Sequence, residues 1–154
     1  MNIFIDKASQ KDSKIIWKWK NDPISLKMSF IGNFVTWEEH QTWYKNCLEK
    51  NDIEIYIAKT LKVPIGVVRF EKCIENKNIS NISINLAPEF RNKGFSIKIL
   101  IKAIKTYWNE NNSENIINAE IKKENIKSIK LFENCGFILV EDKVSKLIYS
   151  LKRS

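Results

Sequence analysis

The sequence has few of the residues that build metal sites, disulfide frameworks and membrane spans. It contains three cysteines, Cys47, Cys73 and Cys135, and one histidine, His40. An odd number of cysteines without metal-type spacing argues against a disulfide framework and against a zinc site. A single histidine makes a histidine-based catalytic triad a poor interpretation. The apolar runs are only a few residues long, well short of the roughly 20 residues that cross a bilayer. We therefore expect no metal and no membrane association.

What is present suits one folded domain. The chain has 154 residues, of which 44 % are hydrophobic, including eight Phe, five Trp and four Tyr. This length supports a single core, so we expect one domain over residues 1–154. The first residues, Met1–Asp6, lack the basic region and the long apolar stretch of a signal peptide. Together these features predict a soluble, reduced, cytoplasmic domain.

The charge is positive but unevenly distributed. The formal net charge is +8, and only three of the 26 basic residues are arginine. Residues 1–75 carry 12 basic and 10 acidic groups, and residues 76–154 carry 14 and 8. Scarce arginine and the lack of a recognised nucleic-acid motif disfavour a nucleic acid as partner. Within the second half, residues 91–130 hold nine basic and four acidic groups, so we expect a small anionic ligand there.

Hydrophobic periodicity predicts an α/β fold. Thr36 and Glu39 fit a capping box, Asn125 can cap a later helix, and Gly136 can end it. The expected strands are 2–5, 53–57, 63–70, 79–86, 116–121, 137–140 and 147–151, and the expected helices are 10–20, 36–48, 97–108 and 125–134. The order β-α-α-β-β-β-α-β-α-β-β predicts a mixed central sheet with an antiparallel meander, flanked by helices.

One segment combines features of an anion site. Ile82–Ser96 runs from a predicted strand through a turn holding Arg91, Lys93 and Gly94 and then enters a long helix. The first amides of a helix lack partners within it, and the helix dipole adds positive character there. Gly94 allows close backbone approach or a positive φ. These features favour a pyrophosphate cradle, although an ordinary basic turn with a glycine fits the same residues.

A second segment supports the cradle. Arg91-x-x-Gly94-x-Ser96 and Asn125-x-x-Ser128-x-x-Leu131-Phe132-x-x-x-Gly136-Phe137 together resemble the acetyl-CoA motifs of the GNAT N-acetyltransferase superfamily. The match covers roughly residues 62–142, and the predicted element order agrees with that fold. The resemblance implies a GNAT acyl-CoA N-acyltransferase fold with acetyl-CoA as co-substrate. Residues 80–140 would form the acetyl-CoA-binding core, and residues 1–50 would lie on the acceptor side.

The resemblance also implies roles for individual residues. Backbone amides of residues 92–96 would hold the CoA pyrophosphate, with charge added by Arg91 and Lys93, and the strand end at Leu86 and Ala87 would pair with the pantetheine arm. The implied cofactor-binding residues are Leu86, Ala87, Arg91, Asn92, Lys93, Gly94, Phe95, Ser96, Asn125, Ser128 and Phe132. For Asn125, a plain helix N-cap is an equally simple role.

Phe132 departs from the superfamily pattern. Many members carry Tyr at this position, where the phenol can protonate the departing thiolate, and Phe cannot do so. A thiol pKa near 8.5 makes thiolate a tolerable leaving group. A catalytically weak acyl-CoA-binding module is therefore an alternative to an N-acetyltransferase.

The amine must be neutral to attack, so a general base is required. Glu120, in the strand before the second motif, is the candidate, and Ser83 and Asn85 on the long central strand could orient a water or the substrate. A solvent-facing glutamate paired with a lysine is the alternative for Glu120. His40 is a second candidate base, but an incidental surface histidine in an early helix fits it better.

The N-terminal third sets acceptor choice in this superfamily. Trp19-Lys20-Asn21 and the downstream Glu39-His40 resemble a branch that acetylates UDP-linked 4-amino-4,6-dideoxy sugars in pseudaminic acid synthesis for flagellin glycosylation. They also resemble N-terminal acetyltransferases of ribosomal proteins. The predicted substrate-binding residues are Trp19, Lys20, Asn21, Met28 and His40. We expect a nucleotide-sugar amine as acceptor, with protein α-amino groups and small amines or antibiotics as alternatives. Many superfamily members form a homodimer.

Overall fold

One seven-stranded sheet organises the chain. The computed structural model describes residues 2–61, 63–112 and 115–154. The strands are β1 (Phe4–Lys7), β2 (Ile53–Thr60), β3 (Val63–Lys72), β4 (Ile79–Leu86), β5 (Ile116–Lys122), β6 (Ile138–Asp142) and β7 (Lys146–Lys152). The α-helices are α1 (Ser13–Lys20), α2 (Pro23–Met28), α3 (Trp37–Glu49), α4 (Phe95–Glu110) and α5 (Ile126–Asn134). Short 3₁₀ turns, η1 (Gln10–Asp12) and η2 (Pro88–Phe90), precede α1 and α4.

The sheet divides into two parts that diverge. The strand order is β1-β2-β3-β4-β5-β7-β6, and neighbouring strands are antiparallel except for the parallel pair β4 and β5. That parallel pairing is short, with residues 79–81 opposite residues 116–118. Beyond it the two strands separate, so the carboxyl halves of β4 and β5 border a gap. The predicted fold class is confirmed.

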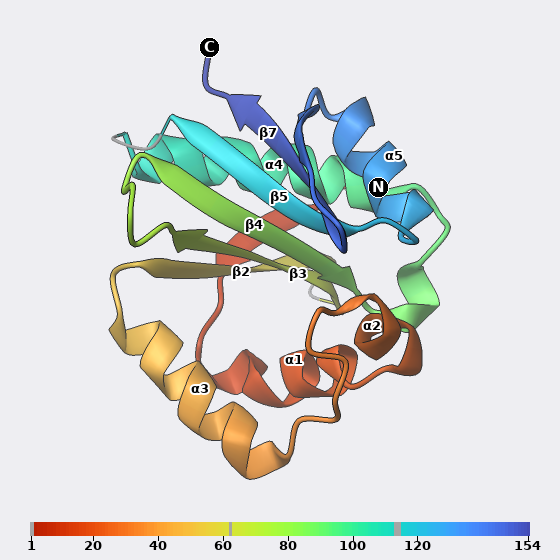
Figure 1. Ribbon diagram of the computed structural model, residues 1–154. Coiled ribbons are helices and arrows are strands. Elements are labelled where there is room, and N and C mark those ends of the chain that lie inside the picture. Colours follow the sequence, from red (N-terminus) through yellow and green to blue (C-terminus); the bar gives the residue numbers. More distant parts are fainter. Residues whose placement is uncertain (1, 62, 113–114) are drawn as a thin grey trace.

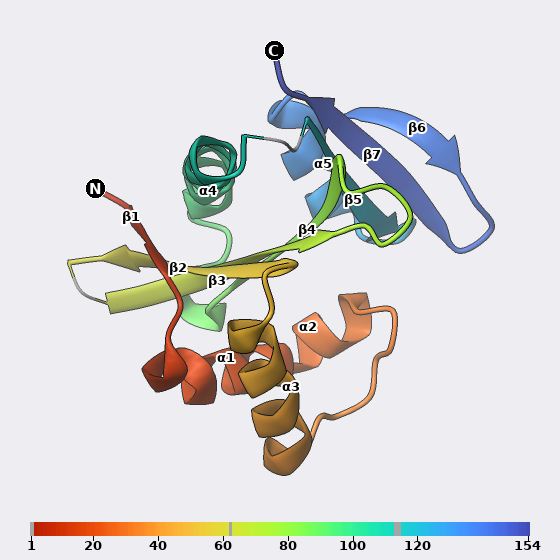
Figure 2. The ribbon, with the colours of Figure 1, turned by 90° about the vertical axis from the view of Figure 1, so that its left-hand side faces the viewer.

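Period-two alternation gives the sheet two different faces. On β3 and β4, Val68, Phe70, Ile82 and Leu86 point to the side of α4 and pack with its apolar stripe, for example Ile99. α4 and α5 cover this face, and α1, α2 and α3 lie on the opposite side of the sheet (Figures 1 and 2). Residues of the first face form the main core, which extends across β5 and β7. The second face is described with the site below.

Local signals explain most of the helices. Thr36 Oγ1 accepts from the Glu39 N–H at 3.2 Å, and the Glu39 carboxylate accepts from the Thr36 N–H, which confirms the predicted capping box. Asn125 Oδ1 accepts from the Ser128 N–H at 3.2 Å and caps α5. Gly136, at a φ of +93°, follows α5 as predicted.

The structure contains one helix that periodicity did not predict. Asp22 caps α2 by accepting from the N–H groups of Ile24 and Ser25, and Pro23 occupies the first helical position. The Asn21-Asp22-Pro23 sequence ends α1 as expected, but the same residues also begin α2. With only six residues, α2 is too short to show an amphipathic pattern.

None of the helices in the described part of the chain has the length and apolarity to cross a membrane.

Candidate active site

A cavity of about 610 Å³ lies between the helical layer of α1 to α3 and strands β3, β4 and β5. Helix α1 contributes Lys20, helix α2 contributes Ser25, Leu26 and Met28, and the segment after α2 contributes Phe30. The other side is formed by the sheet and by the start of α5. The sheet and α5 residues that line it include Arg69, Ser83, Asn85, Glu120, Asn125, Ser128 and Phe132.

Strand alternation places polar side chains among the apolar ones on the sheet wall of the cavity. Arg69 on β3 pairs in register with Ser83 on β4, and Val67 pairs with Asn85, so these four side chains share one face. Glu120 lies on the same side, since its neighbours Ala119 and Ile121 are buried in the main core. The structure thus brings the three predicted catalytic residues, Ser83, Asn85 and Glu120, into one cavity.

Glu120 is held by a lysine. Its carboxylate forms an ion pair with the ammonium group of Lys146 on β7, and the glutamate side chain remains 37 % exposed. The Lys146 ammonium also lies 5.6 Å from the ring centroid of Phe30. The pairing agrees with the predicted alternative, a strand glutamate paired with a lysine, and the same side chain also lines the cavity.

The β4 edge that faces the gap is open beyond residue 81. The Ala87 N–H donates to Ile65 O at 2.9 Å, so the hydrogen bonds of Ala87 point toward β3. Antiparallel pairing alternates, which directs the N–H and C=O groups of Ile84 and Leu86 toward β5 and the gap. Of the two residues expected to pair with a pantetheine arm, Leu86 presents its N–H to the gap while its carbonyl accepts from Arg91, and the amide of Ala87 is already used.

The turn before α4 has the backbone shape of an anion cradle. Asn92 has a φ of +62° and Gly94 a φ of +81°, and both residues are exposed together with Lys93. Gly94 is the N-cap of α4 and supplies no side chain to its first amides. Lys127 on α5 donates to Asn92 Oδ1 at 2.7 Å and places another cation beside the turn. No atom lies within 4 Å of a Cβ built on Gly94, so its backbone conformation, not crowding, favours glycine.

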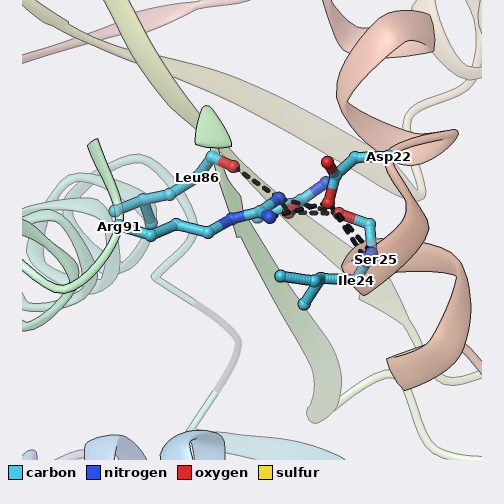
Figure 3. A network of polar contacts seen from close by, with 6 residues as sticks. Asp22, Ile24, Ser25, Leu86 and Arg91 are labelled. Atoms are coloured by element: carbon cyan, nitrogen blue, oxygen red, sulfur yellow. Dashed lines mark hydrogen bonds and ion pairs between the residues drawn. The ribbon is translucent and has the colours of Figure 1, made fainter. Parts of the chain in front are cut away.

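Arg91 has partners other than the expected phosphate (Figure 3). Its guanidinium donates to Asp22 Oδ2 at 2.6 Å, to Ser25 Oγ at 3.0 Å and to Leu86 O at 3.0 Å. The Arg91 and Asp22 side chains are only 18 % and 16 % exposed. The Ser25 hydroxyl in turn donates to Asn85 Oδ1 at 3.0 Å. Arg91 therefore ties α2, a wall of the cavity, to the open end of β4.

This ion pair affects the titration of Asp22. Burial raises the pKa of the Asp22 carboxyl, but hydrogen bonds from Arg91 and from the Ser25 and Ile24 amides outweigh burial, so the pKa is below its ordinary value of 3.8. Asp22 thus remains charged at neutral pH, which keeps α2 attached to Arg91.

Phe132 lies where α5 meets the cavity. Its ring is 4 % exposed and packs edge-on against Phe137 at 5.0 Å between centroids. Asn125 and Ser128 line the same region from the first turn of α5. No hydroxyl stands at position 132, so this position supplies no proton to a leaving group.

His40 is buried, and its prediction as a surface histidine was wrong. It is 0 % exposed and stacks on Trp37 and Tyr44, while its Nε2–H donates to Ser13 O at 3.0 Å. Desolvation and, second, the charge of Lys20 lower the pKa of His40 from 6.5 to about 4. His40 does not line the cavity, so its burial corrects the expectation that it contacts substrate. Its spacing from aromatic residues three before and four after was a signal of this packing.

Of the other predicted substrate residues, some line the cavity and some do not. Lys20 and Met28 line the cavity, whereas Trp19 is 4 % exposed within the core under α1. Asn21 accepts from the Val35 N–H and donates to Val35 O, so its side chain fixes the segment after α2 instead of facing the cavity. Trp43, Ser25 and Arg69 line the cavity and were not among the predicted residues.

Comparison with known proteins gives the family. Residues 2–138 match the model of the acetyltransferase (GNAT) domain. An uncharacterized protein of Methanocaldococcus jannaschii is 28 % identical over 138 residues, which are 88 % of this chain and 28 % of that protein. Acetyltransferase PseH of Campylobacter jejuni is 23 % identical over 146 residues, covering 95 % of this chain and 89 % of PseH. The chain thus spans under a third of the first relative and most of the second.

Solved structures share the fold. Spermidine N-acetyltransferase from Vibrio cholerae, in complex with CoA and spermine, superimposes with a TM-score of 0.85 at 17 % identity over 98 % of this chain and 95 % of that one. PseH of Campylobacter jejuni in complex with acetyl coenzyme A has a TM-score of 0.75 at 19 % identity over 99 % and 100 %.

Proposed function

Because this chain belongs to the GNAT acetyltransferase family, we propose that it transfers acetyl from acetyl-CoA directly to a primary amine. The preferred acceptor is the 4-amino group of a UDP-linked 4-amino-4,6-dideoxy sugar. The observation that carries the proposal is the cavity, which holds the predicted catalytic residues Ser83, Asn85 and Glu120 beside the gap between β4 and β5.

The residues around the gap fit acetyl-CoA. The exposed turn with left-handed Asn92 and Gly94 leads into uncapped amides of α4, which suits a pyrophosphate. Lys93 and Lys127 supply positive charge beside it. The open edge of β4 at Ile84 and Leu86 offers backbone groups to an extended arm, as an added strand does. Solved relatives of the same fold contain CoA or acetyl-CoA.

The acceptor preference rests on three observations. The Trp19-Lys20-Asn21 segment resembles the sugar-acetylating branch, the match to PseH extends over 95 % of the chain, and the sheet wall carries hydroxyl, amide and guanidinium groups. Such groups suit a hydroxylated, charged substrate better than an apolar one.

We assign Glu120 the role of general base in the acetyl transfer. The amine loses a proton to the Glu120 carboxylate, directly or through water, and its nitrogen then attacks the thioester carbonyl. As the C–S bond breaks, the acetylated nitrogen releases its remaining extra proton to water, and the thiolate takes a proton from water because Phe132 has none to give. Lys146 holds the carboxylate in place, and Ser83 and Asn85 orient the acceptor. An N–H of the open β4 edge stabilises the developing oxyanion.

Incubation with acetyl-CoA and UDP-4-amino-4,6-dideoxy-N-acetyl-β-L-altrosamine tests the proposal. We expect release of free thiol and a mass gain of one acetyl group on the sugar. Glu120→Gln is expected to lower kcat at least tenfold with acetyl-CoA affinity unchanged, and Glu124→Gln, at an exposed position after β5, serves as the matched control. Turnover of peptide amines without turnover of the sugar contradicts the acceptor assignment and supports an N-terminal acetyltransferase.

Phe132 favours a second candidate, a catalytically weak acyl-CoA-binding module. This candidate predicts tight CoA binding in calorimetry with no transfer to a panel of sugar, peptide and polyamine acceptors. The Phe132→Tyr substitution separates an acetyltransferase from a module that only binds acyl-CoA. A phenol at this position should raise the turnover of an enzyme, whereas a binding module should stay inactive.

A further inference from the structure

Two cations meet at the inner end of the cavity. Lys20 comes from the last turn of α1 and Arg69 from the middle of β3, and both line the cavity. The Lys20 ammonium lies 3.8 Å from the ring centroid of Trp43, and the Arg69 guanidinium carbon lies 5.4 Å from the same centroid. Two segments far apart in the chain thus place their charges against one tryptophan.

The carboxylates that line the cavity are not paired with these charges. Among the ion pairs of the described residues, none includes Lys20 or Arg69. The carboxylates that line the cavity have other partners, since Glu39 is bonded to Thr36 and Glu120 to Lys146. Desolvation and, second, repulsion by Arg69 lower the pKa of Lys20 from 10.5 to about 8. The cluster therefore has excess positive charge in a half-buried position.

Such an arrangement destabilises the protein unless something offsets it. Like charges held close together repel, and partial burial removes the water that would screen them. The Trp43 ring attracts both cations through its quadrupole but carries no net charge. Packing alone would be served by neutral side chains, whereas an anionic ligand would satisfy both groups.

We propose that Lys20 and Arg69 form an anion subsite for the acceptor, taking phosphate-type oxyanions such as the diphosphate of a nucleotide-sugar. This rests on the proposed function and names a part of that site. Arg69 presents a planar fork suited to oxyanions, and the register-paired Ser83 hydroxyl lies beside it. The Trp43 ring offers a flat surface next to the anion.

The subsite also separates substrate classes. Glu120 lines the cavity from β5, whereas Lys20 and Trp43 line it from helices α1 and α3. This arrangement fits an acceptor whose amine lies near Glu120 and whose anionic group lies near Arg69. A polyamine would bring ammonium groups toward two cations, so acceptors such as spermine, present in the Vibrio cholerae enzyme structure, are disfavoured here.

Binding of UDP and of inorganic pyrophosphate to the CoA-saturated chain tests the subsite without requiring turnover. Saturation with CoA prevents either probe from occupying the cofactor cradle. We expect Lys20→Met and Arg69→Met each to weaken both probes about tenfold, and Arg69→Lys to retain part of the affinity. Lys18→Met, at an exposed position on the same helix, is the matched control and should bind as the parent does. Far-UV circular dichroism and thermal melting confirm that each variant is folded.

The outcomes separate the subsite from the acceptor. If the parent binds neither probe, or if both Met variants bind as tightly as the parent, the subsite is overturned even where the sugar is acetylated. If the probes bind through Lys20 and Arg69 but the UDP-sugar is not acetylated, the subsite is supported and the acceptor proposal fails. Binding of UDP without pyrophosphate assigns recognition to the nucleoside and contradicts an oxyanion site.

Discussion

The two faces of the central sheet are built from alternate residues of the same strands, yet they differ in kind. Toward α4, strands β3 and β4 present side chains such as Val68 and Phe70 to a continuous apolar core. Toward α1 to α3 they present Arg69, Ser83 and Asn85 to a cavity. One face therefore carries the main core, and the other, which we call the acceptor face, lines the cavity proposed to bind the acceptor. Residues that line the cavity can change without disturbing the main core.

The largest expected difference between the faces is in packing. Phe70 is 0 % exposed and stacks on Tyr107 with 4.0 Å between ring centroids. We expect Phe70→Ala to lower the free energy of unfolding by about 3–5 kcal/mol, since it removes buried surface and leaves a cavity. Phe30→Ala, at a 49 % exposed ring of the acceptor side, should change it by under about 0.5 kcal/mol. Urea denaturation measures both, and equal losses would contradict the division.

The helical layer of the acceptor face is expected to be the pH-sensitive one. His40 has a pKa of about 4 when folded and 6.5 as its ordinary value, so the unfolded chain binds the proton more tightly. Stability is fully present above pH 6.5 and declines as pH falls toward 4, by about 2 kcal/mol between pH 7 and pH 5. Since His40 is the only histidine, His40→Gln should flatten this dependence in urea titrations. A slope that survives the substitution would assign it to other groups.

The two faces can also be compared through the hydroxyl group of one buried tyrosine on each. The Tyr107 hydroxyl lies 2.6 Å from Ser80 Oγ in the main core, and the Tyr44 hydroxyl donates to Ser9 O at 2.7 Å under α3. Tyr107→Phe should cost about 1.5 kcal/mol, because Ser80 is 0 % exposed and loses this partner. Tyr44→Phe should cost about 0.5–1 kcal/mol, because a partly buried carbonyl can recruit water. Thermal or urea unfolding of both variants checks the order.

A further effect, on acceptor binding and not on stability, is expected where the acceptor face meets the cofactor turn. Asp22→Asn keeps an oxygen to cap α2 but removes the charge that holds Arg91. We expect the KM of the acceptor to rise about fivefold, which is roughly 1 kcal/mol, because α2 lines the cavity. Acetyl-CoA affinity should change less than twofold. A selective loss of acetyl-CoA affinity would instead indicate that Asp22 and Arg91 serve the cofactor. Steady-state kinetics and calorimetry supply the two numbers.

Sequence-based prediction succeeds where the determinants are local. The Thr36 capping box, the long amphipathic α4 and the Asn125 cap each depend on residues within one or two turns. The position of Arg91 was equally clear from its motif, but the direction of its side chain depends on Asp22, 69 residues away. The sequence pattern within one segment does not indicate a hydrogen-bond partner that lies so far away in the chain.

Burial in the helical layer was harder to predict for the same reason. His40 is covered by rings of its own helix and by the Ser13 carbonyl of α1. The spacing of Trp37, His40 and Tyr44 puts them on one helix face, but only the packing of α1 against α3 decides whether that face is exposed. Arg69 was not predicted to line the site because a single charged residue in an apolar strand gives no local indication of a binding role.

The short parallel pairing between β4 and β5 has a consequence for folding cooperativity. In the described part of the chain, residues 79–81 pair with residues 116–118, and Asn78 O accepts from the Asn115 and Ile116 amides. Few backbone hydrogen bonds of these residues therefore hold the two parts of the sheet together. Side chains of α4, β5 and β7 in the shared core provide most of the connection. Hydrogen exchange should therefore reveal β5 to β7 with α5 as a separate opening unit, coupled to the rest through side-chain volume. The gap that exposes the β4 amides thus also marks the boundary between two foldons.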